Sequence, residues 1–244
     1  PNFVIASDSE AISNAYFSFL MRKSCSLNLI DFQPQPKGVT RQILAGGLTE
    51  GSFNFEVGRQ QFNYDSLPYA SVEVETIVAT FPNAVKLVGR DFARSTVFQR
   101  MDRNTILHLA THAAFVKGAP EDSFILFGDG SLVNLQEVRD WNLENVDLIV
   151  LSACQTGVGE VLGNGEEILG FGYQLEQAGA LATLATLWRV DDRATQELTI
   201  DFYRALKNGA SKAEALREAQ NIMMSGEFHH PYYWAPFILI GNGF

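Results

Sequence analysis

The sequence is poor in cysteine and in long apolar runs, and each shortage excludes a class of protein. Only two cysteines occur among 244 residues, and no CxxC pair is present, so a disulfide framework and a zinc site built on cysteine pairs are excluded. No run approaches the roughly 18 apolar residues of a transmembrane helix, and no signal-peptide pattern is visible. We therefore expect a cytoplasmic protein whose thiols stay reduced.

Positive charge is also scarce. Lysine and arginine number 18 against 28 acidic residues, which gives a formal net charge of −10. This balance argues against general binding to nucleic acids or anionic membranes. The 46% apolar fraction is ordinary for a globular protein with a substantial core. The chain begins with Pro1 rather than Met, which suggests a piece of a longer protein.

Apolar strands alternate with helices along most of the chain. Strands that are apolar throughout and separated by helices indicate a mostly parallel sheet of about six strands, covered by helices on both faces. The predicted strands lie at 41–47, 84–89, 105–112, 147–154, 179–188 and 234–243. A hairpin is expected at 124–134, where Asp129-Gly130 suits a tight turn.

The remaining segments define the expected boundaries. Residues 1–37 predict an N-terminal helical extension or the end of a preceding module, and 38–244 predict one α/β domain. Residues 47–69 have no clear period and predict a long loop. Ser71 is the expected N-cap of a helix over 71–81, while Asp191 or Asp192 caps a later helix and Ser211 with Glu214 forms a capping box.

Two predicted strands end in residues suited to nucleophilic chemistry. One strand ends at His112 and another at Cys154, and functional sites in open parallel sheets form at the carboxyl ends of the strands. An adjacent imidazole lowers a thiol pKa or accepts its proton, and then protonates a leaving amine. Backbone N–H groups in the glycine-rich turn after Cys154 could stabilise an oxyanion. Neighbouring strands would therefore bring a base and a nucleophile together.

Other interpretations of these residues remain open. A free cysteine at a strand end is most often a buried packing residue. His108 and His112 lie on one face of a strand and could form a zinc pair, although the HExxH pattern is absent and His108 is expected in the core. Asp191 and Asp192 could offer carboxylates to a basic substrate side chain. Cys25 lies outside the alternating region and is expected to be incidental.

Several motifs together resemble the CHAT domain family, a group of caspase-like domains often found behind tetratricopeptide repeats or other modules in bacteria. The motifs are "HLATH", "LSACQTG", "GEEILGFGYQLEQAGA", "ATLWRVDDRAT", "FYRALKNGASKAEALREAQ" and "HPYYWAPFILIGNG". The resemblance implies a three-layer caspase-like or separase-like α/β fold. It also implies a dyad in which His112 is the general acid and base and Cys154 the nucleophile, with an oxyanion hole from the backbone N–H groups of Ala113 and Cys154.

Two positions depart from the family pattern. Ala113 stands where the family usually has glycine, and Arg189 stands where it often has proline. Ser152, Asp191 and Asp192 are the residues expected near the substrate, and the acidic pair together with related peptidases suggests cleavage after a basic residue.

The resemblance predicts a cysteine endopeptidase that acts on a protein substrate through an acyl-enzyme, without metal or cofactor, and that other modules such as tetratricopeptide repeats regulate. The alternative is a catalytically silent caspase-like module that binds protein partners. In the first case we expect the loop at 47–69 and the loop after Cys154 to be mobile.

Overall fold

A computed structural model describes residues 41–115, 121–156 and 166–244 of the chain. The predicted N-terminal extension at 1–37, which includes Cys25, and the glycine-rich segment at 157–165 lie outside the described residues. The proposed boundary between residues 37 and 38 therefore stays a prediction.

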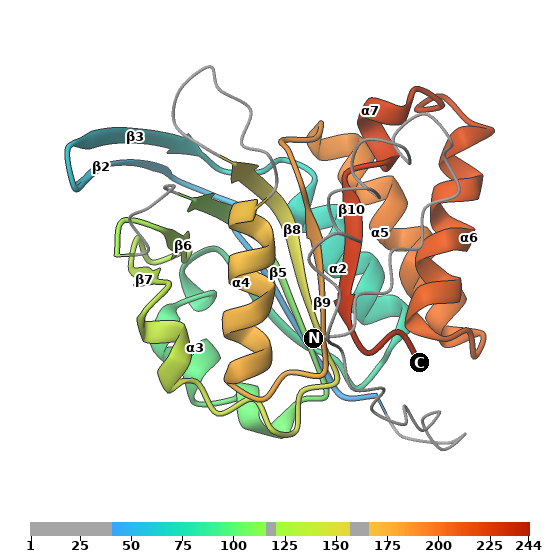
Figure 1. Ribbon diagram of the computed structural model, residues 1–244, viewed down its shortest axis with the longest axis horizontal. Coiled ribbons are helices and arrows are strands. Elements are labelled where there is room, and N and C mark those ends of the chain that lie inside the picture. Colours follow the sequence, from blue (N-terminus) through green and yellow to red (C-terminus); the bar gives the residue numbers. More distant parts are fainter. Residues whose placement is uncertain (1–40, 116–120, 157–165) are drawn as a thin grey trace, which may run out of the picture.

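One mixed sheet forms the centre of the domain (Figure 1). Its main path has the order β10-β9-β8-β5-β1-β4, and all neighbours pair in parallel except β9 and β10. The bounds are β1 Ile43–Gly47, β4 Val85–Val88, β5 Ile106–Phe115, β8 Leu148–Thr156, β9 Ala182–Thr186 and β10 Phe237–Gly241. The six predicted strands are thus confirmed, and the apolar run that ends the chain is an antiparallel edge strand. The predicted hairpin at 124–134 is also confirmed, as β6 Phe124–Leu126 and β7 Leu132–Asn134, and it extends the sheet from the end of β5.

Helices cover both faces of the sheet, as the alternating pattern predicts (Figure 1). One face packs against α4, Glu166–Gln177, and the short α3, Arg94–Phe98. The other packs against α2, Ala70–Thr80; α5, Asp192–Lys207; α6, Lys212–Met224; and the short α7, Pro231–Trp234. Single-turn 3-10 helices occur at Gly89–Asp91, Met101–Arg103 and Glu137–Asp140. No helix in the described part of the chain is long and apolar enough to cross a membrane.

The segment predicted as a long loop is instead an antiparallel hairpin, so that prediction is wrong. Strands β2, Ser52–Val57, and β3, Gln60–Asp65, pair around a turn in which Gly58 has a φ of 62°. Aromatic side chains alternate along both strands and pack on the start of β6, where Phe55 and Phe62 contact Phe124. Polar residues alternate with the aromatic ones, so the sequence has the two-residue period of a strand but no continuous apolar run. The hairpin returns the chain to the carboxyl end of β5.

The helix starts agree only in part with the predicted caps. Ser71 does not cap α2, because the helix begins at Ala70 and its N-cap position, Tyr69, has no side-chain cap. The backbone N–H of Tyr69 donates instead to the carboxylate of Asp192. The other predictions are confirmed: Asp191 caps α5, and the Ser211–Glu214 capping box starts α6.

Candidate functional site

The two candidate dyad residues come from neighbouring strands. β5 and β8 pair in parallel, and the Cα register matches Ala113 with Cys154. Before that pair the register shifts between Ala110 and Ala113, so Thr111 and His112 lie opposite a single residue of β8. Such a bulge redirects side chains at the end of a strand and occurs often beside active sites. His112 is therefore one residue away in register from the backbone of Cys154.

The imidazole of His112 is held on two sides by the β2–β3 hairpin. Its Nε2 lies 2.8 Å from the carbonyl oxygen of Asp65, and its ring stacks on Tyr64 with centroids 4.4 Å apart and planes 16° apart. A carbonyl oxygen only accepts hydrogen bonds, so Nε2 carries the proton in this contact. Nδ1 of the neutral ring is consequently the nitrogen left to act as a base.

His112 is tuned toward its neutral form. Only 8% of the residue is exposed, and this burial lowers the pKa of the imidazole below its usual 6.5. The hydrogen bond to the Asp65 carbonyl raises that pKa, whereas the positive charge of Arg189 lowers it further. The result is an unprotonated, oriented imidazole at neutral pH, which is the state that a general base requires.

The backbone of Cys154 lies in β8, one residue pair from the bulge, while its side chain lies outside the described residues. The strand assignment also bears on Ala113. It lies inside β5, paired with Ile125 of β6 as well as with Cys154. An extended backbone suits alanine, so the missing glycine introduces no positive-φ strain there. The role of its backbone N–H in an oxyanion hole stays a prediction.

His108 occupies a different environment from His112. It is completely buried, as predicted, and this burial lowers its pKa to about 3. Its Nε2 lies 3.4 Å from the carboxylate of Glu73, without hydrogen-bond geometry. Among the described residues, no group of three or more His, Cys, Asp or Glu is placed to hold a metal ion.

A buried carboxyl group lies beneath the two strands. Glu73 projects from α2 with 1% of its surface exposed, and the Ser152 hydroxyl lies 2.9 and 3.0 Å from its two carboxylate oxygens. Burial raises the pKa of Glu73 to about 7, although the hydrogen bond from Ser152 lowers it. Ser152, predicted to lie near the substrate, is itself 2% exposed, and its hydroxyl is directed into the protein toward α2.

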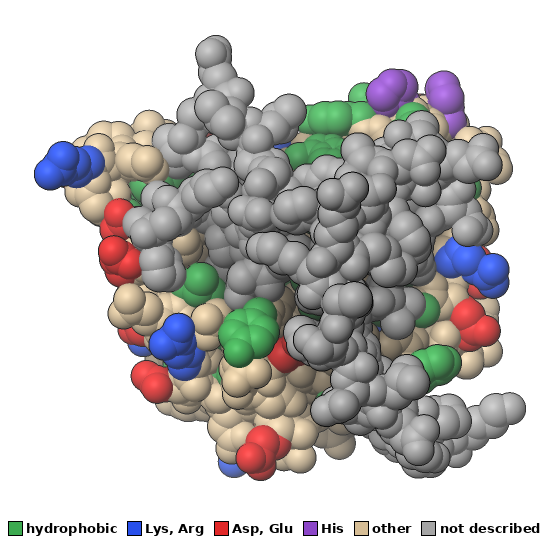
Figure 2. All heavy atoms as spheres, in the orientation of Figure 1, with side chains coloured by type: hydrophobic (Ala, Val, Ile, Leu, Met, Phe, Trp, Pro, Cys, Tyr) green, Lys and Arg blue, Asp and Glu red, His purple; other side chains and the backbone are tan. Residues whose placement is uncertain are grey.

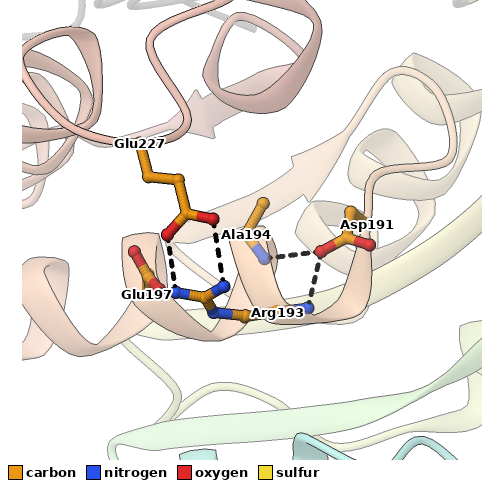
Figure 3. A network of polar contacts seen from close by, with 5 residues as sticks. All are labelled: Asp191, Arg193, Ala194, Glu197 and Glu227. Atoms are coloured by element: carbon orange, nitrogen blue, oxygen red, sulfur yellow. Dashed lines mark hydrogen bonds and ion pairs between the residues drawn. The ribbon is translucent and has the colours of Figure 1, made fainter.

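The acidic pair lies at the start of α5, at the same edge of the sheet. Asp191 accepts hydrogen bonds from the backbone N–H groups of Arg193 and Ala194, and Arg193 makes a two-pronged contact with Glu227 (Figure 3). Asp192 accepts the Tyr69 N–H, and burial raises its pKa. Both carboxylates therefore have structural partners, and their contact with a substrate remains a prediction.

Aromatic residues and a cation complete this edge. Arg189 is exposed, its carbonyl accepts the hydroxyl of Tyr232, and its charge acts on both Tyr64 and His112. The indole of Trp188 donates to the Tyr232 carbonyl, which fixes the segment after β9 against α7. The surface histidines visible in Figure 2 lie near α7, in contrast to the buried pair on β5. Arg189, which stands where the family often has proline, thus places a positive charge near the candidate base His112.

Three residues of this site, Tyr64, Asp65 and Glu73, are not among the site residues predicted from the sequence. Tyr64 and Asp65 were hidden in the segment predicted as a loop, although the alternating aromatics at Phe53, Phe55, Phe62 and Tyr64 were a usable signal. Glu73 was overlooked because the helix was recognised by its apolar residues. Its spacing from Val74 and Ile77 puts it on the buried face, where an acid is unusual.

The structure is a three-layer α/β domain with His112 and the backbone of Cys154 on neighbouring strands at the carboxyl edge of the sheet, which is the class of fold that the motifs predicted. The sequence profile of the CHAT domain family matches residues 13–242. The chain therefore belongs to the CHAT domain family, as its motifs predicted.

Curated relatives match a smaller part of the chain. Tetratricopeptide repeat protein 28 of Mus musculus is 27% identical over 72% of this chain, and the protein of that name from Homo sapiens is 28% identical over the same share. The matched region is only 9% and 8% of those two proteins. This chain thus spans less than a tenth of relatives named for tetratricopeptide repeats.

Solved structures confirm the fold. The Arg-specific cysteine proteinase gingipain R superposes on 83% of this chain and 46% of its own, with a TM-score of 0.53 and 10% identity. A complex of the pro- and mature domains of the Porphyromonas gingivalis protein gives a TM-score of 0.54 over 84% and 47%, at 9% identity. At such low identity the likeness shows the caspase-like fold alone.

Proposed function

We propose that the chain is a cysteine endopeptidase that hydrolyses peptide bonds in a protein substrate through His112 and Cys154. The observation that carries the proposal is the register between β5 and β8, which pairs Ala113 with Cys154 next to an imidazole oriented by Asp65. Membership of a family with a caspase-like fold supports the same chemistry.

The proposed reaction has two steps. Nδ1 of His112 accepts the thiol proton, and the thiolate attacks the peptide carbonyl, while the backbone N–H groups of Ala113 and Cys154 bind the oxyanion. The C–N bond breaks as His112 protonates the leaving amine, which leaves a thioester on Cys154. His112 then removes a proton from water, the hydroxide attacks the thioester, and the acid product and free thiol are released.

The test uses a peptide library together with a cysteine-directed acyl-mimic inhibitor and peptide mapping. The wild-type chain is expected to cleave peptides and to be labelled at Cys154, and both should disappear in Cys154→Ala and fall strongly in His112→Ala. Cys25→Ala is the matched control and should retain both. Cleavage that survives Cys154→Ala, or labelling at Cys25 instead, would contradict the proposal. Cleavage lost to a chelator would favour a zinc hydrolase, and no cleavage or labelling in any variant would favour a silent interaction module.

We further propose a preference for cleavage after a basic residue, for which Asp192 is the better placed of the two acids. Asp191 is committed to the N-terminus of α5, whereas Asp192 is half-buried beside Tyr69. The amide variant Asp192→Asn should lower cleavage after arginine relative to leucine, while Asp191→Asn should leave the ratio unchanged. An unchanged ratio in both variants, or faster cleavage after acidic residues beside Arg189, contradicts this preference.

We also propose that a tetratricopeptide-repeat module or another regulatory module gates the activity. The names of the curated relatives support such a context. The rate of Cys154 labelling should differ between this chain alone and the natural polypeptide that contains it together with such a module. Equal rates would count against gating.

A further inference from the structure

A single carboxyl group contacts both strands that carry the candidate dyad. Glu73 reaches from α2 to Ser152 on β8, two residues before Cys154, and to His108 on β5, four residues before His112. Glu73, Ser152 and His108 are each at most 2% exposed. The group therefore lies directly beneath the edge where the dyad forms.

No positive charge compensates the buried carboxyl in the described structure. The titratable groups that face it are His108 on β5, and Asp192 and Tyr203 on α5. His108 has a pKa near 3 and is neutral, and the charge of Asp192 raises the pKa of Glu73. Burying an unpaired carboxylate costs free energy, and buried groups with displaced pKa values concentrate at functional sites. A neutral glutamine of the same shape would fill this position at lower cost.

The two protonation states of Glu73 offer different hydrogen bonds. The carboxylate has acceptor oxygens only, and both lie within 3.0 Å of the Ser152 hydroxyl. The carboxylic acid adds one O–H donor, for which the neutral His108 imidazole, 3.4 Å away, offers an acceptor. Protonation of Glu73 thus shifts its hydrogen bonding from Ser152 on β8 toward His108 on β5.

We propose that Glu73 is a positioning residue that holds the end of β8 through Ser152, and that its ionised form keeps Cys154 in register with His112. The proposal rests on the proposed function, since it names a residue that supports the same dyad. Glu73 acts through Ser152 and does not touch the substrate. The ionised state is the competent one, because a carboxylate oxygen accepts the single Ser152 hydroxyl proton more strongly than the carbonyl oxygen of a carboxylic acid does.

The first experiment follows the rate of Cys154 labelling by a peptidyl acyloxymethyl ketone between pH 5.5 and 8.5. In the wild-type protein the rate should fall as the pH drops through about 7, where Glu73 gains its proton. In Glu73→Gln that step should vanish, so that the rate falls only at a lower pH, where His112 gains its proton, because burial holds the pKa of His112 below its usual value. The rate of this variant at pH 8 should be about two- to tenfold lower, the scale of one net hydrogen bond.

Two further variants make the test specific. Ser152→Ala leaves Glu73 in place and should lower the rate of Cys154 labelling at pH 8 by a similar factor. Adding Glu73→Gln to this variant should lower the rate no further. Glu75→Gln, an exposed acid on the same helix, is the matched control and should behave as wild type. A wild-type profile in Glu73→Gln, or losses that multiply in the double variant, would overturn the proposal. If Glu73→Gln does not fold, the Ser152→Ala profile decides: a retained wild-type rate at pH 8 overturns it.

Hydrogen exchange separates this proposal from the proposed function. Local opening of the second half of β8, followed by exchange of amides that do not require global unfolding, should become more frequent as the pH falls through about 7 in the wild type and should stay level in Glu73→Gln. A wild-type protein that never labels Cys154 contradicts the peptidase function, whereas the exchange result still decides the role of Glu73. Protection that is equal in the two proteins at every pH would overturn the positioning role.

Discussion

Two histidines on β5 show how position along a strand decides the chemistry of a side chain. His108 lies in the sheet interior with 0% exposure, neither ring nitrogen has a hydrogen-bond partner, and its pKa is near 3. His112 lies four residues further on, past the bulge, with Nε2 on the Asp65 carbonyl and its ring on Tyr64.

Both imidazoles are neutral at pH 7, but only one is oriented. The interior histidine contributes packing beside Tyr203, with ring centroids 5.6 Å apart. The edge histidine gains a fixed tautomer from a carbonyl on the hairpin, so its free nitrogen is defined. Burial alone therefore makes a structural histidine, and burial combined with a directional hydrogen bond makes a candidate base.

The largest expected effect separates the two histidines by substitution. His112→Ala should lower the rate of Cys154 labelling by about 100- to 10,000-fold, the range of general acid–base catalysis. His108→Ala should lower the free energy of unfolding by about 2–4 kcal/mol, because it opens a cavity in the core. Labelling rates by mass spectrometry and urea unfolding of both variants provide the comparison. Equal loss of labelling in the two folded variants would remove the distinction.

The next effect concerns the carboxyl group beneath His108. The pKa of Glu73 is raised from 4.5 unfolded to about 7 folded, so the folded state binds the proton more tightly. That stabilisation is complete below pH 4.5 and is lost as the pH rises through about 7. Glu73→Gln should therefore gain stability relative to wild type between pH 5 and 8, by on the order of 3 kcal/mol.

Unfolding by urea at several pH values checks this prediction, with Glu75→Gln as the control. Glu75 is an exposed acid paired with Lys86, so its variant should track the wild type at every pH. A difference between Glu73→Gln and wild type that does not change with pH would mean that Glu73 keeps an ordinary pKa.

The smallest expected effect tests the ring that supports His112. Tyr64→Leu removes the aromatic stack and should lower the labelling rate by about two- to tenfold, the scale of an aromatic pair. Tyr64→Phe keeps the ring and removes only a hydroxyl whose pKa burial raises to about 12, so it should resemble wild type. His108 should be insensitive to both changes, which NMR of its imidazole can verify. An unchanged rate in Tyr64→Leu would show that Asp65 orients His112 without help from the stack.

The sequence predicted the parts of this site that depend on where each strand ends. Apolar runs ending at His112 and Cys154 placed both residues at the carboxyl edge of the sheet, whereas the pairing of β5 with β8 is seen only in the structure. The bulge could not be predicted, because it depends on how β6 and β8 pair with β5 and not on a local pattern.

The groups that tune the site were harder to predict for a physical reason. Asp65 acts through its backbone carbonyl, which any residue provides, so no side-chain signal marks it. Glu73 acts from a helix whose partner strands follow much later in the chain, and only the three-dimensional fold brings it to Ser152. Side chains suited to catalysis can be recognised in a sequence. The contacts that orient them join residues far apart in the chain and cannot be predicted from a local pattern.

The most direct test is a crystal structure of the protein after reaction with a peptidyl acyloxymethyl ketone. We expect the inhibitor joined to Cys154, Nδ1 of His112 within about 4 Å of that sulfur, and Nε2 still on the Asp65 carbonyl. A separation of more than about 7 Å, or an imidazole turned so that Nδ1 faces Asp65, would contradict the assignment of His112 and Cys154 as a catalytic pair.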